Sequence, residues 1–204
     1  GRGRRGRTWQ SRDGNFMATL LLAPAPPPAK AAQLSFLAAL CVADTLDALG
    51  AHEIFLKWPN DVVIGAAKIA GILLESSGEN GARWLGVGIG INLAWAPAGT
   101  PYPATSLAGA TGREAPPPEH VLNLLAARWS AHYESWSRDG FQPIRLDWLR
   151  RAKGIGETIR VQNGADEIEG VFRTINAAGA LVLATRGGEQ LISAGDVFFT
   201  RIKT

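Results

Sequence analysis

Apolar residues at helical or strand-like spacing divide the chain into predicted elements. Residues 29–49 are apolar at helical spacing and are followed by Gly50, which predicts an amphipathic helix ending there. Further helices are predicted over 119–139 and near 143–152. Short apolar runs bounded by turn residues predict strands at 15–23, 53–58, 61–64, 68–76 and 83–94. The Pro-rich stretch 95–118 is predicted to be a loop.

The pattern changes after "KGIGE" (153–157), which is a plausible linker. From about residue 155 to 204, short strand-like runs are joined by "NG", "AAG" and "RGG", which predicts a small all-β barrel. We therefore predict an α+β protein of two domains, residues 1–152 and 153–204. The first is expected to hold a mixed β-sheet with helices packed on it.

Composition narrows the class of protein. The apolar runs are interrupted well short of a membrane span, and no apolar segment of a signal peptide follows the first arginines. The single cysteine, Cys41, excludes an internal disulfide. These features favour a cytoplasmic protein without a membrane partner.

The positive charge is concentrated at one place. Residues 1–12 contain five arginines and no acid, whereas the other 192 residues carry 16 basic and 18 acidic groups. A nucleic-acid surface would spread its positive charge over a face of the protein. A compact arginine loop is better suited to a small anion such as a phosphate or a carboxylate.

Four stretches could form one site: "GRGRRGRTW" (1–9), "KWPND" (57–61), "KIAGIL" (68–73) and "GVGIGIN" (86–92). Joining a carboxylate to a nucleoside triphosphate brings together two anions that repel each other. Arginine forks and a lysine would supply the positive charge that bridges them, and glycines would let the backbone approach a ligand.

The remaining polar and aromatic residues of these stretches have roles in such a site. Asp61 can help to hold Mg²⁺ on a phosphate, and Asn60 and Asn92 can position ribose or phosphate oxygens. The alternating glycines, Gly88 and Gly90 among them, leave a slot for a flat or apolar tail. The tryptophans expected near the ligand are Trp9, which could cover this slot or an adenine, Trp58 and Trp95.

The four stretches, in this order and spacing, resemble the signature motifs of biotin protein ligases, and "YPATSL" (102–107) and the C-terminal strands match the same family. The resemblance covers essentially the whole chain. It implies a first domain like that of class II aminoacyl-tRNA synthetases and an SH3-like second domain. It also implies that biotin and ATP form biotinyl-5′-AMP, with Mg²⁺, and that biotin is then transferred to a lysine of a biotin carboxyl carrier domain of acetyl-CoA carboxylase or a related carboxylase.

The resemblance also implies residue roles. Lys68 and Arg4 would be catalytic, because Lys68 would contact the biotin carboxylate and the α-phosphate. The biotin site would comprise Arg2, Gly3, Arg4, Lys68, Gly88 and Gly90. The ATP and adenylate site would comprise Arg4, Arg7, Trp9, Asn60, Asp61, Asn92 and Trp95, with Asp61 as the candidate Mg²⁺ ligand.

One part of the family pattern is not among these 204 residues. The family carries an upstream Ser-Thr-Asn stretch and a Gln that touch the biotin rings, so either earlier residues precede Gly1 or half of the biotin pocket is lacking. Three alternatives stay open: a lipoate or octanoate ligase of the same fold, an RNA-binding module that uses the arginine–glycine string, and a non-catalytic relative. A homodimer is possible, and no nucleic-acid partner is expected from these residues.

Overall fold

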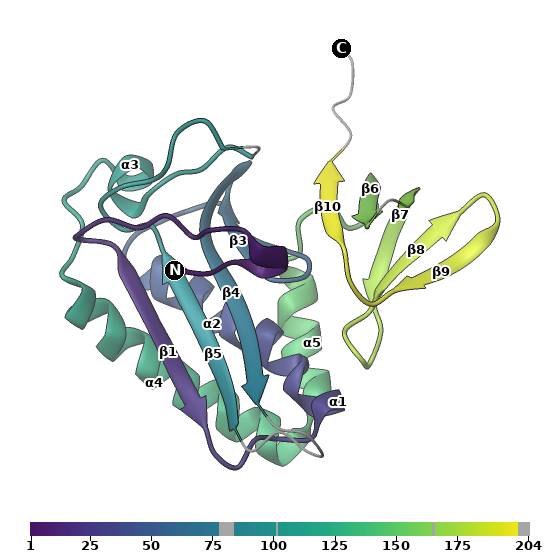
Figure 1. Ribbon diagram of the computed structural model, residues 1–204, viewed down its shortest axis with the longest axis horizontal. Helices are drawn as coiled ribbons and strands as arrows, with labels where there is room; N and C mark the ends of the chain where they lie inside the picture. The colour runs from purple at the N-terminus through teal and green to yellow at the C-terminus, as the bar shows by residue number, and fades with distance from the viewer. Residues whose placement is uncertain (78–83, 101, 165, 200–204) are drawn as a thin grey trace.

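The computed structural model describes residues 1–77, 84–100, 102–164 and 166–199 (Figure 1). Its first sheet has five strands in the order β1-β5-β4-β3-β2. Their bounds are Phe16–Leu22 (β1), Ile54–Lys57 (β2), Asp61–Ile64 (β3), Ala67–Ser77 (β4) and Trp84–Ile91 (β5). The five strands lie close to the predicted ranges.

All the pairings within this sheet are antiparallel, so the prediction of a mixed sheet is wrong. The physical reason lies in the connections. Strands β2 to β4 follow one another through turns of a few residues, and a strand that returns through a tight turn pairs antiparallel. Parallel pairing is limited, in the described part of the chain, to isolated bridges such as Leu56 with Ala152 and Lys68 with Ala104.

Helices cover one face of the first sheet (Figure 1). The predicted helix 29–49 is divided at Ala32 into α1 (Pro28–Ala31) and α2 (Gln33–Ala48), and α2 is buried along most of its length. Helices α4 (Pro118–Asp139) and α5 (Phe141–Arg150) pack beside it. The stretch Pro28–Ala48 has the length and apolar composition of a membrane span, but 67% of its most apolar window is buried inside the protein, as in a core helix.

The predicted loop 95–118 contains a short helix, α3 (Leu107–Thr111). Ser106 caps its start, because the Ser106 hydroxyl accepts a hydrogen bond of 3.1 Å from the Gly109 amide. Gly112 ends it with a left-handed backbone (φ 67°). The capping residues were visible in "SLAGATG", but the five residues between them include a single large apolar side chain, Leu107, which gave no helical periodicity.

The second sheet has the order β10-β6-β7-β8-β9, and all its pairings are antiparallel. Its strands are β6 (Thr158–Asn163), β7 (Asp166–Ile175), β8 (Leu181–Thr185), β9 (Gly188–Ile192) and β10 (Asp196–Phe199). The turn before β8 packs against the first part of the protein, where the Trp58 indole donates a hydrogen bond of 3.0 Å to the Gly179 carbonyl. This contact places the second sheet beside the open face of the first (Figure 1).

Candidate active site

The face of the first sheet that is free of helices carries a row of small residues. Strand register aligns Gly90 with Met17 on one side and with Gly71 on the other, and Gly88 lies between Thr19 and Leu73 in the same way. Because side chains alternate along a strand, these residues share the open face. A cavity of about 520 Å³ lies over this face.

The cavity brings together almost all the residues that the sequence pointed to. Its lining includes Arg2, Gly3, Arg4, Arg7, Trp9, Asn60, Asp61, Lys68, Gly88, Gly90 and Asn92. Trp95 is not among the lining residues that the structure describes. The prediction from four separate stretches therefore corresponds to one concave surface, with Trp95 outside it.

The arginine–glycine stretch folds back on itself as a closed loop. The Trp9 amide donates to the Gly1 carbonyl at 3.0 Å, and the Gly3 amide donates to the Arg7 carbonyl at 2.7 Å. The tip, Arg4–Gly6, is one 3-10 turn, and Gly6 has φ of 72°, which suits glycine. The loop is therefore held closed by its own backbone hydrogen bonds, and Arg2, Arg4 and Arg7 line the cavity.

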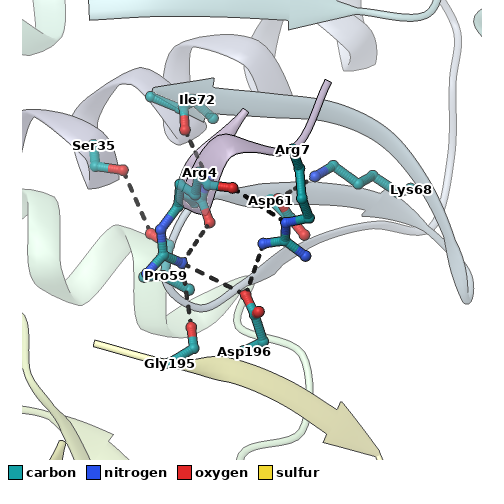
Figure 2. A network of polar contacts seen from close by, with 10 residues as sticks. Arg4, Arg7, Ser35, Pro59, Asp61, Lys68, Ile72, Gly195 and Asp196 are labelled. Atoms are coloured by element: carbon teal, nitrogen blue, oxygen red, sulfur yellow. Dashed lines mark hydrogen bonds and ion pairs between the residues drawn. The ribbon is translucent and has the colours of Figure 1, made fainter. Parts of the chain in front are cut away.

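Arg4 and Arg7 are held at the mouth of the cavity by side chains and carbonyls from distant parts of the chain (Figure 2). One Arg4 nitrogen, Nη1, lies 3.2 Å from Asn60 Oδ1 and 3.2 Å from the Gly195 carbonyl. Arg7 Nε donates to the Arg4 carbonyl at 3.3 Å, and Arg7 Nη2 lies 3.0 Å from Asp196 Oδ1. Arg2 also lines the cavity, but its side chain is 85% exposed and lies 3.6 Å from Glu75, another lining residue.

Lys68 and Asp61 form an ion pair inside the cavity, with Nζ 2.5 Å from Oδ1 (Figure 2). The two residues come from neighbouring strands, β4 and β3, where a register shift between Val62 and Val63 disturbs the pairing. An anion that enters the cavity would meet an ammonium whose charge is already partly balanced. Binding would exchange the Asp61 carboxylate for the ligand as the partner of Lys68.

The "KWPND" stretch divides between the cavity and the protein core. Asn60 donates through Nδ2 to the Ile72 carbonyl at 2.7 Å while its Oδ1 faces Arg4, so this side chain fixes the arginine to the sheet. Trp58, expected near the ligand, is 2% exposed and bonds the second sheet. Trp58 is not among the described residues that line the cavity, because its indole packs toward the turn before β8.

Trp9 fills the slot that the glycines leave. A Cβ placed on Gly90 would lie 2.6 Å from Trp9 Cε2, and one on Gly71 would lie 3.3 Å from Trp9 Cζ3. Lys68 Nζ is 5.6 Å from the centre of the same ring. The indole nitrogen is buried and has no hydrogen-bond partner among the described residues. Trp9 therefore covers the slot, as the sequence suggested.

Asn92 lies at the cavity end of β5 and is 2% exposed. Its Nδ2 donates to the Thr105 carbonyl at 3.1 Å, and its Oδ1 is buried without a partner among the described residues. Its backbone joins Ile69 on one side and the start of α3 on the other. Asn92 thus lines the cavity with its side chain fixed by Thr105, while its Oδ1 stays buried.

Asn15 is a residue that the sequence reasoning missed. Its Oδ1 accepts hydrogen bonds of 3.0 Å from the amides of Leu93, Ala94 and Trp95, and its Nδ2 donates to the Trp95 carbonyl at 2.8 Å. The Arg12 guanidinium lies over the Trp95 ring at 4.2 Å. Arg12 and Asn15 thereby fix the end of the loop that follows β5. In the sequence, the only sign of this role is that an asparagine, Asn15, directly precedes the apolar residues of a strand.

Tyr102 and Lys57 also belong to the surroundings of the cavity, although the sequence assigned neither of them a specific role there. Tyr102 lines the cavity, and its ring lies 4.1 Å from Lys57 Nζ and 5.4 Å from the Phe198 ring of the second sheet. Burial raises the pKa of Tyr102 to about 12. Burial also lowers the pKa of Lys57, although the charge of Asp61 acts in the opposite direction. Tyr102 thus lines the cavity, and Lys57 lies directly behind its ring.

The cavity fits a magnesium ion only together with phosphate. No cluster of three or more His, Cys, Asp or Glu that could hold a metal is found in the described ranges. Asp61 offers a carboxylate in the cavity, with the amide oxygen of Asn92 also at its wall. Because Mg²⁺ is commonly held by one or two carboxylates plus substrate phosphates, this donor set suits an ion that arrives with a nucleotide.

The chain belongs to the biotin/lipoate A/B protein ligase family. Residues 1–92 match that family's model, and residues 154–200 match the biotin protein ligase C-terminal domain. The biotin–[acetyl-CoA-carboxylase] ligase of Paracoccus denitrificans is 48% identical over 210 residues, which cover 98% of this chain and 86% of that protein.

Other relatives agree with this assignment. The bifunctional ligase/repressor BirA of Bacillus subtilis is 34% identical, and the match covers 97% of this chain and 62% of that protein. The biotin protein ligase of Aquifex aeolicus, solved with biotin and ATP, has a TM-score of 0.84 at 28% identity and covers 98% of this chain and 84% of that one. The ligase of Leishmania major with biotinyl-5-AMP has a TM-score of 0.58 at 27% identity, with 95% and 84% covered.

Proposed function

We propose that the protein is a biotin–protein ligase that uses ATP. The observation that carries the proposal is that Arg4, Lys68 and the glycine slot of β5 line one cavity. In the first step, a biotin carboxylate oxygen attacks the α-phosphorus of ATP, and the bond to pyrophosphate breaks. In the second, the amine of an acceptor lysine attacks the carbonyl carbon of biotinyl-5′-AMP. The carbonyl–oxygen bond to AMP then breaks and an amide remains.

The charges in the cavity suit the first step. Lys68 lines the cavity, and its ammonium would lower the repulsion between the carboxylate and the α-phosphate if the two meet beside it. Arg4, fixed by Asn60 and the Gly195 carbonyl, would contact the phosphates through its guanidinium, and Arg7 lies beside it. These three cations come from two segments far apart in the sequence.

The other proposed contacts follow from position. Gly88, Gly90 and Trp9 would hold the flat rings or the apolar chain of biotin, with Arg2 and Gly3 above them. Asn92 would bind ribose or phosphate groups. Asp61 and phosphate oxygens would hold Mg²⁺, which would supply positive charge to the triphosphate. Trp95 lies beyond the cavity lining and would reach an adenine only if the loop after β5 moves.

We also propose the finer architecture. Residues 1–152 would form a domain like that of class II aminoacyl-tRNA synthetases, supported by an antiparallel sheet with helices on one face. Residues 153–204 would form an SH3-like domain, supported by the five short antiparallel strands β6–β10. The acceptor would be a carboxyl carrier domain of acetyl-CoA carboxylase or a related carboxylase in the cytoplasm, and homodimer formation is a separate proposal.

The proposal is tested by pyrophosphate release from the purified protein. Release should require biotin and ATP together, and neither lipoate nor octanoate should replace biotin. A purified carrier domain should then gain the mass of one biotinyl group on a lysine. Release with lipoate or octanoate and not with biotin would favour the other acid ligases of this family and contradict the assignment.

A further inference from the structure

Asp196, the first residue of β10, places a carboxylate against the two arginines of the cavity mouth (Figure 2). Its Oδ1 lies 3.0 Å from Arg7 Nη2 and 3.9 Å from Arg4 Nη1. The preceding residue, Gly195, accepts from Arg4 through its carbonyl at 3.2 Å. Two adjacent residues at the start of β10, Gly195 and Asp196, therefore contact the arginine loop.

A carboxylate at this place has two opposite effects on an anionic ligand. Its negative charge lowers the positive potential at the cavity mouth, which weakens the attraction for phosphate. Its hydrogen bond fixes the long Arg7 side chain, which otherwise loses rotamer freedom when a ligand binds. The first effect predicts that neutralising Asp196 tightens nucleotide binding, and the second predicts that it weakens binding.

The surroundings of Asp196 favour the second effect. The Asp196 side chain is only 21% exposed, and Arg4 at 3.9 Å is 20% exposed, whereas Arg7, which makes the 3.0 Å hydrogen bond, is 51% exposed, so the carboxylate is sheltered from solvent while the Arg7 side chain has room to move without it. Strand β10 is itself anchored beside the cavity, because the Phe198 ring lies 5.4 Å from Tyr102 and the Phe199 ring lies 5.9 Å from Lys57 Nζ. An acid on a fixed strand can set the position of a flexible loop.

We propose that Asp196 is a positioning residue, which holds Arg4 and Arg7 at the cavity mouth in the orientation that receives the ATP phosphates. The nucleotide part of this inference rests on the function proposed above. The hold on the loop does not, because it concerns the protein without ligand. In this arrangement the second sheet contributes to nucleotide affinity although none of its residues needs to touch the nucleotide.

The test compares Asp196→Asn with two other variants. Asp196→Glu retains the carboxylate on a longer side chain. The matched control, Glu167→Gln, removes an exposed carboxylate of the same sheet that lies 3.5 Å from Arg160 and does not line the cavity. The measurements are the rate of trypsin cleavage after Arg4 and Arg7 without ligand, and kcat and KM for ATP and for biotin in pyrophosphate release. Asp196→Ser serves as a second neutral variant if Asp196→Asn does not fold.

Asp196→Asn should raise the KM for ATP about tenfold, as expected for losing a hydrogen bond between charged groups, with smaller changes in kcat and in the KM for biotin, because Asp196 is closer to Arg7 than to Arg4. Cleavage of the loop should become faster, Asp196→Glu should recover both properties in part, and Glu167→Gln should behave as the unmodified protein. A lower or unchanged KM for ATP, or loop cleavage no faster than in Glu167→Gln, would overturn the proposal. If the unmodified protein releases no pyrophosphate, the proposed function fails, and the cleavage rates still decide whether Asp196 holds the loop.

Discussion

Placing one methyl group on Gly90 tests whether Trp9 fills the glycine slot. In Gly90→Ala the new Cβ would lie 2.6 Å from Trp9 Cε2 and 2.7 Å from Trp9 Nε1. Carbon atoms in contact prefer a separation of about 3.5–4.0 Å, so the indole would have to move by about 1 Å. Gly88 is the matched control on the same strand and face, because its Cβ would approach the Leu73 carbonyl only to 3.4 Å.

The expected cost follows from the packing. Forcing an extra methyl group into a filled site costs about 1–3 kcal/mol, so Gly90→Ala should lower the midpoint of thermal unfolding by roughly 2–12 °C in a protein of this size. Gly88→Ala should leave stability nearly unchanged. Neither glycine has a positive φ, so backbone strain does not complicate the comparison.

A double-mutant cycle isolates the contact. In a Trp9→Ala background the three atoms nearest to the Gly90 methyl group are absent, so Gly90→Ala should then cost much less. Urea denaturation of the four proteins without ligand measures the coupling energy between the two positions. Equal costs of Gly90→Ala with and without the indole, or equal effects of the Gly88 and Gly90 substitutions, would refute the placement of Trp9.

The remaining predictions concern charge and the contact between the sheets. Lys68→Ala and Arg4→Ala should each slow biotinyl-5′-AMP formation on the order of 10²-fold or more in a single-turnover assay, and full activity in both would contradict their roles. Burial acts to raise the pKa of Asp44, but the hydrogen bond with His132 and the charge of a neighbouring arginine outweigh it and hold that pKa below its usual value. This carboxyl therefore adds stability above its unfolded pKa of about 3.9, and the contribution is lost as pH falls through the folded value. Asp44→Asn should reduce the loss of stability on acidification in urea titrations, and an unchanged pH profile would count against the pair. Trp58→Phe should destabilise the protein by about 1–3 kcal/mol, because a carbonyl of the second sheet loses its donor; calorimetry showing no change would disprove that contact.

Features that depend only on neighbouring residues could be predicted from the sequence. Gly50 ends the long helix as predicted. Its backbone is left-handed, a conformation that glycine adopts readily just after the end of a helix. The run 61–64 is a strand with the predicted bounds. The arginine loop could be read as a ligand-binding segment because five arginines within twelve residues have no acid among them to balance their charge.

Features that depend on tertiary contacts could not be predicted in the same way. The direction of strand pairing was predicted wrongly: the short gaps between 53–58, 61–64 and 68–76 favour antiparallel pairing, but the pairing of β1 with β5 joins strands far apart in the sequence and depends on tertiary contacts. Trp58 was placed near the ligand because its neighbours Asn60 and Asp61 are there, but its own side chain points to the second sheet. The contact of Asp196 with Arg7 joins residues 189 positions apart, so no local sequence pattern predicts it.

The most direct test is a crystal structure with a stable analogue of biotinyl-5′-AMP. The account predicts that the phosphate of the analogue lies within hydrogen-bond distance of Lys68 Nζ and the Arg4 guanidinium, and that its bicyclic ring lies along Gly88 and Gly90, with the Trp9 indole displaced from its position over Gly90. It also predicts that Asp61 no longer contacts Lys68 as closely as in the free protein. A ligand bound elsewhere, or a phosphate that neither cation approaches, would contradict the account.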